Sequence, residues 1–111
     1  MEKSEIITKI NDYIKIRENK IIEISLIVNN LSFLNLRDKL IGLGKILEEN
    51  YKKYYYVIKV PAGVANKNSA IVFILWNNDI ISIFSYAKEG LINQHTASKA
   101  IEKVIDRLCN N

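Results

Sequence analysis

The sequence predicts an α/β fold of the α+β type, in which helices pack on an antiparallel sheet. The first observation is the run AIVFILW at residues 70–76, which has no polar side chain on either face of a strand. Such a strand must be covered on both of its faces. The second is that residues 51–60 and 80–87 are also rich in β-branched and aromatic residues. The third is helical periodicity near both ends of the chain.

The N-terminal part of the chain predicts a helix followed by a strand. Residues 3–18 place Ile6, Ile10 and Ile14 on one helical stripe, with Ser4 as the expected N-cap. Residues 20–28, KIIEISLIV, alternate along one face and are rich in Ile and Val, which favours a strand. The same letters also fit a buried helix, so that alternative stays open.

Residues 33–49 predict a second helix. Ser32 is a natural N-cap, and Phe33, Leu36 and Leu40 begin a helical stripe that Leu43 and Leu47 extend. We expect Asn50 to end this helix. Gly42 and Gly44 would lie inside it, although each glycine costs about 1 kcal/mol against alanine in a helix interior.

The centre of the chain predicts a three-stranded antiparallel meander. Its runs are residues 51–60, 70–76 and 80–87, and we expect Pro61 to stop the first of them. Asn77-Asn78-Asp79 predicts a tight turn, because Asn and Asp tolerate the left-handed conformations that hairpins need. The last two runs should therefore be antiparallel neighbours.

Residues 96–108, TASKAIEKVIDRL, predict a strongly amphipathic C-terminal helix. The expected order is thus helix, strand, helix, three strands, helix, with the helices packed on the sheet. We expect the 111 residues, 1–111, to form a single domain.

The order of the elements predicted from Ser32 to Leu108 is helix, three strands, helix. This order is similar to that of the small Alu-RNA-binding subunits of the signal recognition particle. The whole chain also resembles profilin-type and roadblock-type domains in its alternation of helices and strands. Both resemblances concern the order of the elements, and what they imply is a fold.

Composition limits the environments and partners to expect. Lys and Arg number 16 against 12 Asp and Glu, a net charge of +4 that favours polyanions weakly. Cys109 is the only cysteine, so no disulfide within the chain is possible and a reducing, cytoplasmic location is expected. The start of the chain has no signal-like apolar run, and residues 70–76 are too short to span a bilayer, so we expect no membrane association.

No arrangement of residues predicts catalysis, so the expectation is that the protein is not an enzyme. Ser98 and Asp106 are eight residues apart on the predicted helix, roughly 12 Å along its axis, and cannot both meet His95. The chain has one His and one Cys, which argues against a zinc site. No catalytic residue, cofactor or metal is therefore expected.

Lysines and tyrosines interleave in residues 51–59, which is typical of strands that bind single-stranded nucleic acid. On this basis, we expect phosphates to contact the lysines and a base to stack on a tyrosine. The predicted nucleic-acid-binding residues are Lys52, Lys53, Tyr55, Lys59 and Lys67. Edge-strand lysines and strand tyrosines also occur for purely structural reasons, which is the competing interpretation.

Two other functions stay open on the sequence. The amount of apolar surface on the predicted sheet suggests a homo-oligomer, for example a homodimer, or a protein adaptor or inhibitor with an obligate partner. Residues 21–50 also fit a helix-turn-helix with the tyrosine-rich hairpin as the wing of a winged-helix DNA-binding regulator.

Overall fold

A computed structural model describes residues 1–17 and 20–109. Its helices are α1 (Lys3–Asn11), α2 (Phe33–Leu40) and α3 (Thr96–Cys109), with a short 3-10 turn η1 (Val64–Asn66). Its strands are β1 (Ile22–Ile27), β2 (Lys45–Asn50), β3 (Tyr55–Ala62), β4 (Asn68–Asn77) and β5 (Ile80–Ala87). The fold is therefore of the α+β type, as predicted.

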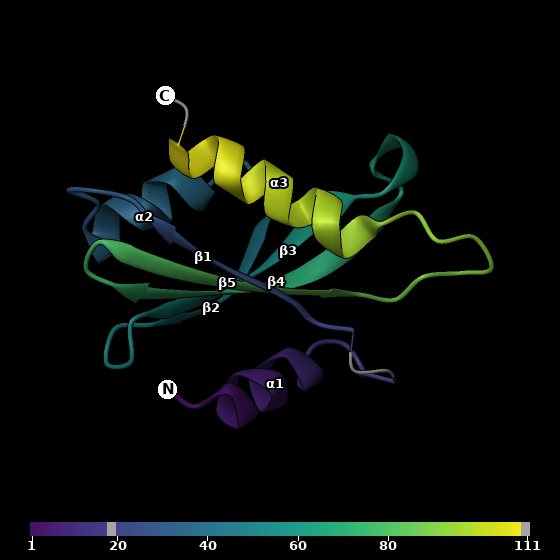
Figure 1. The fold of residues 1–111 in the computed structure, drawn as a ribbon, viewed down its shortest axis with the longest axis horizontal. Coiled ribbons are helices and arrows are strands. Elements are labelled where there is room, and N and C mark those ends of the chain that lie inside the picture. The colour runs from purple at the N-terminus through teal and green to yellow at the C-terminus, as the bar shows by residue number, and fades with distance from the viewer. Residues whose placement is uncertain (18–19, 110–111) are drawn as a thin grey trace.

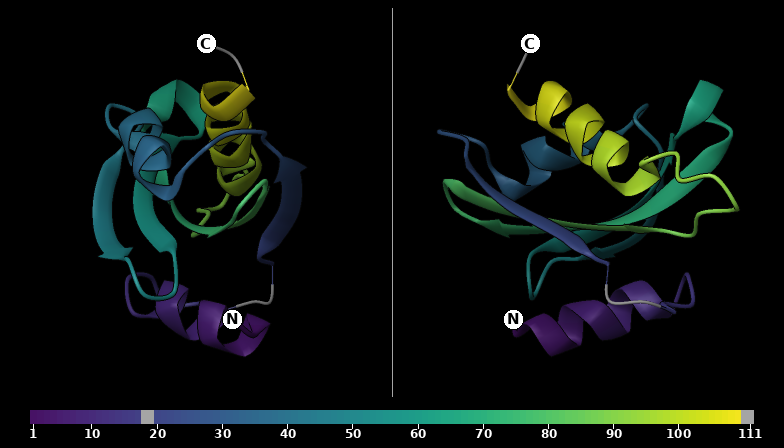
Figure 2. Two further views of the ribbon diagram at one scale, coloured as in Figure 1. Left: turned by 90° about the vertical axis from the view of Figure 1, so that its left-hand side faces the viewer. Right: turned by 45° about the vertical axis from the view of Figure 1, so that its right-hand side comes forward.

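All five strands form one antiparallel sheet in the order β1-β5-β4-β3-β2. Helices α2 and α3 lie on one face of the sheet, and α1 lies on the other (Figures 1 and 2). Because β4 is the central strand, it is covered on both faces, as its composition requires. β1 and β2 are the two edges of the sheet.

The two faces of β4 supply two separate hydrophobic cores. Val72 and Ile74 lie in the larger core, beneath α2 and α3, and Trp76 packs against it. Ile71 and Phe73 lie in the smaller core, which α1 covers with Ile6 and Ile10. The predicted division of this strand into two apolar faces is confirmed.

Helix α1 is shorter than predicted, since it ends at Asn11 instead of residue 18. The N–H of Ile16 donates to the Asn11 side-chain oxygen at 3.0 Å, which turns the chain out of the helix. Ile14 and Ile16 then pack against the smaller core from a non-helical segment. The N-cap is Glu2 and not Ser4, so that prediction was wrong as well.

The helix predicted for residues 33–49 is wrong in its second half. Ser32 is the N-cap, accepting from the Asn35 N–H at 3.0 Å, but α2 ends at Leu40. Gly42 then takes a φ of +89°, which glycine adopts easily, and the chain enters β2. β2 pairs antiparallel with β3. This pairing, which the helical spacing of the leucines does not indicate, adds a fourth strand to the predicted meander.

The first strand of the predicted meander begins later than expected. Residues 51–54 form a turn, with Tyr54 at a φ of +59°, and β3 runs on through Pro61 to Ala62. Pro61 does not stop the strand. After Ser32 the chain has one helix, four strands and one helix, so the element order expected from the Alu-RNA-binding subunits does not hold.

Three other expectations are confirmed. Residues 20–28 contain a strand, β1; the β4–β5 hairpin turns at residues 78–79; and residues 96–108 lie within α3. Because β1 is a strand, the first helix required by the helix-turn-helix interpretation does not exist. No helix in the described part of the chain has the length and apolar character needed to cross a membrane.

Candidate polyanion-binding groove

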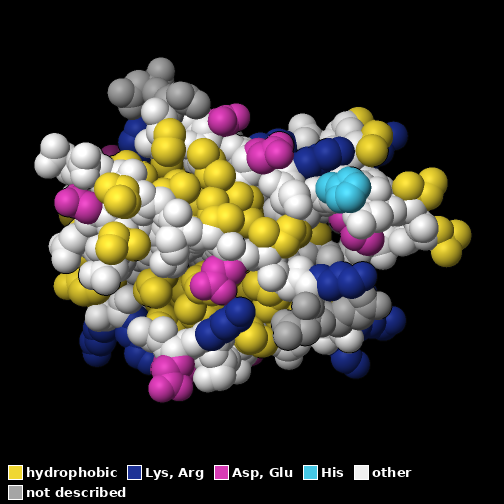
Figure 3. All heavy atoms as spheres, viewed as in Figure 1, with side chains coloured by type: hydrophobic (Ala, Val, Ile, Leu, Met, Phe, Trp, Pro, Cys, Tyr) yellow, Lys and Arg dark blue, Asp and Glu magenta, His cyan; other side chains and the backbone are white. Residues whose placement is uncertain are grey.

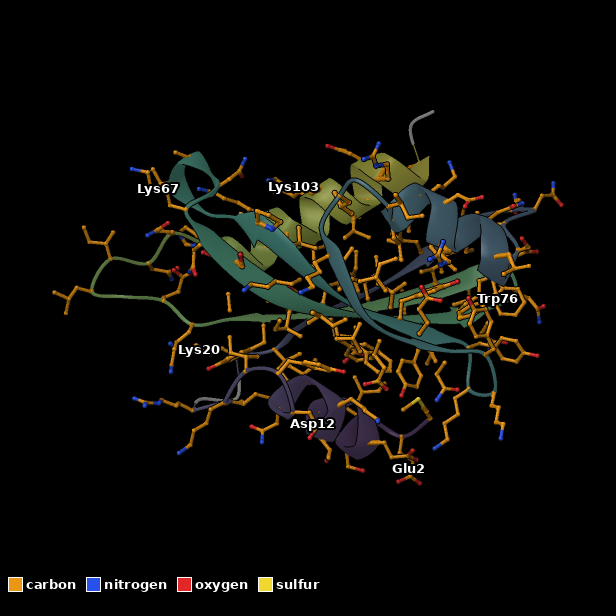
Figure 4. The ribbon with its side chains drawn as sticks, turned by 180° about the vertical axis from the view of Figure 1, so that it is seen from behind. Glu2, Asp12, Lys20, Lys67, Trp76 and Lys103 are labelled. Atoms are coloured by element: carbon orange, nitrogen blue, oxygen red, sulfur yellow. The ribbon has the colours of Figure 1, made fainter. Side chains whose placement is uncertain are left out.

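The structure separates the five predicted binding residues into three places. Lys52 and Lys53 lie in the β2–β3 turn, Tyr55 lies in the smaller core, and Lys59 and Lys67 line one groove. The turn contacts the end of β4, where the Trp76 N–H donates to the Tyr54 carbonyl at 2.9 Å. Trp76 and Lys67 lie at opposite ends of the molecule (Figure 4). The predicted residues therefore do not form one site.

Tyr55 has no solvent-exposed face. It is fully buried, its ring stacks on Phe73 at a centroid distance of 4.6 Å, and its hydroxyl donates to Glu48. The stacking role predicted for this ring is therefore unavailable to it, because a base would have to displace core side chains to reach it.

The other tyrosines of this segment pack around Phe33. Tyr56 stacks on Phe33 at 4.3 Å and donates its hydroxyl to the Phe33 carbonyl at 2.6 Å, while Tyr51 and Tyr54 meet the ring edge-on. Trp76 completes the cluster and donates to the Leu31 carbonyl at 2.7 Å. The interleaving of lysines and tyrosines therefore has a structural explanation in aromatic packing.

The groove that contains Lys59 and Lys67 has a volume of about 440 Å³. Its walls combine two ammonium groups with the hydroxyl of Ser69, over an apolar floor. The side-chain amide of Asn68 donates away from the groove, to the Lys88 carbonyl and the Thr96 hydroxyl. The lining residues are Tyr13, Ile14, Leu47, Lys59, Lys67, Asn68, Ser69 and Ile71. Phosphate oxygens and other anions accept hydrogen bonds from groups of this kind, which are cations with neutral donors beside them.

Lys45 adds a third cation beside the groove. It lies on the edge strand β2, directly opposite Lys59 in the β2–β3 register, so both side chains leave the same face of the sheet. Within residues 1–17 and 20–109, no carboxylate lies within ion-pair distance of Lys45, Lys59 or Lys67. Directly opposed like charges destabilise a strand pair, and a bound anion relieves their repulsion.

The loop that carries Lys67 is held in place by α3. Lys103 of that helix donates to the Pro61 carbonyl at 2.7 Å and to the Asn66 side-chain oxygen at 2.5 Å. Gly63 adopts a φ of +82° at the start of the loop, and a Cβ there would lie 2.6 Å from the Gln94 side-chain oxygen. The β3–β4 connection is therefore anchored at both ends, which fixes the Lys67 backbone beside the groove.

A carboxylate near the groove, that of Glu48, accepts hydrogen bonds from three donors, one of which is a cation. Glu48 accepts from the Tyr13 hydroxyl at 2.6 Å and from Tyr55, and it pairs with Lys9 at 3.2 Å. Burial alone raises the Glu48 pKa, but the three donors outweigh it and the pKa is lowered. The hydrogen bond to Glu48, together with burial, raises the Tyr13 pKa to about 12, so the Tyr13 hydroxyl keeps its proton at physiological pH.

Replacing Glu48 with Gln should reduce the loss of stability in acid. A carboxyl with a lowered folded-state pKa stabilises the fold above its unfolded value, about 4.3, and that contribution disappears as the pH falls through the folded-state value. We therefore expect the difference in unfolding free energy between pH 7 and pH 3.5 to be smaller for Glu48→Gln than for the wild type. Urea unfolding at the two pH values, followed by Trp76 fluorescence, measures this difference. An equal loss of unfolding free energy in both proteins would contradict a lowered Glu48 pKa in the folded state.

A second hollow of about 630 Å³ lies between Arg17, residues 20–22, the 88–95 loop and the start of α3. His95 and Ser98 line it, but Asp106 does not, so the three are not assembled as a catalytic trio. The Glu89 carboxylate fills the anion position at the helix end, accepting from the Thr96 N–H at 2.8 Å and the Gln94 N–H at 3.2 Å. This end of α3 is therefore already capped by the protein's own carboxylate.

Sequence reasoning missed Tyr13 as a lining residue of the groove and Lys45 as a cation beside it. Lys45 gains its position only because residues 45–50 form a strand, and Tyr13 only because the chain leaves the helical path after Asn11. Across residues 1–17 and 20–109, no three His, Cys, Asp or Glu side chains are grouped so as to hold a metal ion. Comparison with protein-family models, curated proteins and solved structures gives no match to this chain.

Proposed function

We propose that the protein binds nucleic acid, RNA or single strands in preference to duplex, through the groove beside β3. The observation that carries the proposal is the cluster of Lys45, Lys59 and Lys67, which no carboxylate of the described residues neutralises. The three ammonium groups contact phosphates, and the Ser69 hydroxyl supplies a neutral donor at the same wall. The net charge of +4 attracts the polyanion from a distance.

Tyr13 replaces Tyr55 as the aromatic contact in this proposal. Its ring lines the groove and is 39% exposed, whereas Tyr55 is fully buried. The hydrogen bond to Glu48 fixes the Tyr13 hydroxyl, so the ring is held in place without a ligand. A splayed base can stack on such a ring, and stacking of this kind accepts any base. The groove therefore favours unpaired nucleotides.

The expected affinity is modest and depends on salt. Three phosphate contacts on a single strand give a slope of about −2 in log K against log salt, or a loss of about 20-fold from 50 to 200 mM. Fluorescence anisotropy with a labelled single-stranded RNA, a single-stranded DNA and a duplex, each at both salt concentrations, measures this dependence. Absence of binding to all three at 50 mM salt would refute the proposal.

A charge reversal distinguishes the groove from the tyrosine-rich turn. We expect Lys59→Glu to weaken binding of single-stranded RNA at least tenfold at 50 mM salt, because it removes one phosphate contact and adds a repulsive charge. Lys52→Glu makes the same change in net charge at the β2–β3 turn and should alter binding less than twofold. Equal losses in the two variants would mean that net charge, and not the groove, governs binding. Circular dichroism of both variants checks that they fold.

A protein adaptor is the second candidate function, and a different surface favours it. Exposed apolar side chains gather beside β1, including Ile27 at 76% and Ile80 at 48% exposure. Association through an apolar surface holds as salt increases, whereas phosphate contacts weaken. The two salt concentrations in the binding assay therefore separate the two functions.

A further inference from the structure

Strand β1 is an edge strand whose outer backbone has no partner within the described chain. It pairs with β5 on one side only, from Ile22 opposite Ser85 to Ile27 opposite Ile80. The outward N–H and C=O groups of a six-residue strand are a template for another extended segment. Figure 1 looks onto this edge, with β1 crossing in front of the sheet, and the left view of Figure 2 shows β1 and β2 at opposite sides.

The surface around this edge is mainly apolar. Figure 3, seen from the same side, shows hydrophobic side chains in a broad area across the middle of the molecule, with few charged groups inside it. Ile27 and Ile80 lie opposite each other on the α1 side of the edge and are both exposed. Glu23 is the one charged residue of β1, and it pairs with Lys3 at 3.2 Å. Partly buried residues on the α2–α3 side are Ile22, Ile24, Leu26 and Val28.

The opposite edge of the sheet is protected. β2 contains a bulge between Ile46 and Glu48, and it carries Lys45 and two glutamates in six residues. Bulges and charges are the features with which natural sheets prevent pairing between edges. β1 has no bulge in its pairing with β5, no proline and no lysine. One edge is therefore open and the other is closed.

We propose that β1 pairs antiparallel with β1 of a second copy of this chain, so that two five-stranded sheets join into one of ten strands. A surface that meets its own copy about a two-fold axis makes a closed dimer. Because β2 is blocked, no further copy can add and a fibre does not form. The binding groove lies beside β2 and β3, at the far edge, so the inference does not depend on the proposed function.

The strand is complementary to itself in this arrangement. Residues directly opposite each other in an antiparallel pair share a face, so an odd-numbered residue meets an odd-numbered one. The two registers with the longest overlap of residues 22–27 place Ser25 opposite the partner's Ser25 or the partner's Glu23. In both registers Glu23 faces Ile27 or Ser25 of the partner subunit and never its own copy. The like-charge contact that would oppose pairing is therefore absent, and the apolar residues on both faces of the edge are covered.

Ser25→Glu tests the interface directly. The new carboxylate faces either its own copy or the partner's Glu23, so like charges meet in both registers. We expect the wild type to sediment as a dimer of twice 12.8 kDa at 100 μM, and Ser25→Glu to raise the dimer dissociation constant at least tenfold. Ser4→Glu, the same change on the exposed first turn of α1, should leave it unchanged.

Hydrogen exchange of the wild type gives a readout that needs no variant. Amides of residues 22–27 that face outward should be protected at 100 μM and lose at least tenfold of that protection on dilution to 1 μM. A monomer at all concentrations, a dimer whose 22–27 amides exchange at the same rate after dilution, or Ser25→Glu dimers as tight as the wild type would overturn the proposal. A stable complex formed only with another protein would also overturn it.

Discussion

Replacing Gly44 with Ala is expected to lower the free energy of unfolding by about 3 kcal/mol, the upper end of the usual cost of forcing atoms into packed space. A Cβ at Gly44 would lie 2.1 Å from the Lys59 carbonyl oxygen and 3.1 Å from the Val60 Cα, both backbone atoms. Neither atom can move without separating β2 from β3. Urea unfolding followed by fluorescence of Trp76, the only tryptophan, measures the loss.

Gly90→Ala is the matched control for this change. Gly90 lies in the loop before α3, and a Cβ there meets no atom within 4 Å. Its φ lies outside the left-handed region, so alanine adopts the backbone without strain. We expect no loss, or a gain of about 0.5 kcal/mol from a less flexible unfolded chain. Similar unfolding free energies for the two variants would show that the close approach of β2 to β3 at Gly44 is not required.

Replacing Phe33 with Ala should cost about 4 kcal/mol, within the range for deletion of a buried aromatic side chain. Phe33 is 6% exposed, stacks on Tyr56 at 4.3 Å and contacts Tyr51, Tyr54 and Trp76 edge-on. The lost ring leaves a cavity at the junction of α2, β3 and β4. Urea unfolding followed by far-ultraviolet circular dichroism is the suitable measurement, because the change also alters the environment of Trp76.

Leu34→Ala is the control, since it deletes apolar atoms from the next residue of α2. Leu34 is 63% exposed, and leucine and alanine both favour helices, so the unfolding free energy should change by less than about 0.5 kcal/mol. A loss for Phe33→Ala no larger than that for Leu34→Ala would contradict the central role of the aromatic cluster.

The groove and the aromatic cluster divide the lysines and tyrosines between two tasks. Tyr51, Tyr54 and Tyr56 surround Phe33 at one end of the sheet, while Lys59 and Lys67 line the groove at the other. At ~3.3 Å per residue, Tyr55 and Lys59 are separated by about 13 Å along β3. One strand therefore supplies core packing at its start and a candidate binding surface near its end.

The sequence by itself determined the elements whose signals are local. Residues 70–76 have apolar side chains on both faces, and the Asn-Asn-Asp turn joins them to β5, so the central hairpin follows from composition and turn chemistry. The amphipathic pattern of α3 is also complete within a few residues. The cationic character of Lys59 and Lys67 was visible in the same way. The alternation of residues 20–28 favoured a strand but left a helix open, and pairing with β5 decided between them.

Only the tertiary structure decided the elements whose local signals conflict. The spacing of Leu36, Leu40 and Leu47 fits one long helix, but pairing with β3 draws residues 45–50 into the sheet. In a helix, Gly42 and Gly44 would each cost about 1 kcal/mol against alanine, whereas in the strand Ile46 and Leu47 pack against the two cores. The groove depends on the same event, since Lys45 comes opposite Lys59 only when β2 forms. The spacing of apolar residues shows which side chains could share a face of a helix or of a strand. Pairing with β3 decides that residues 45–50 form a strand.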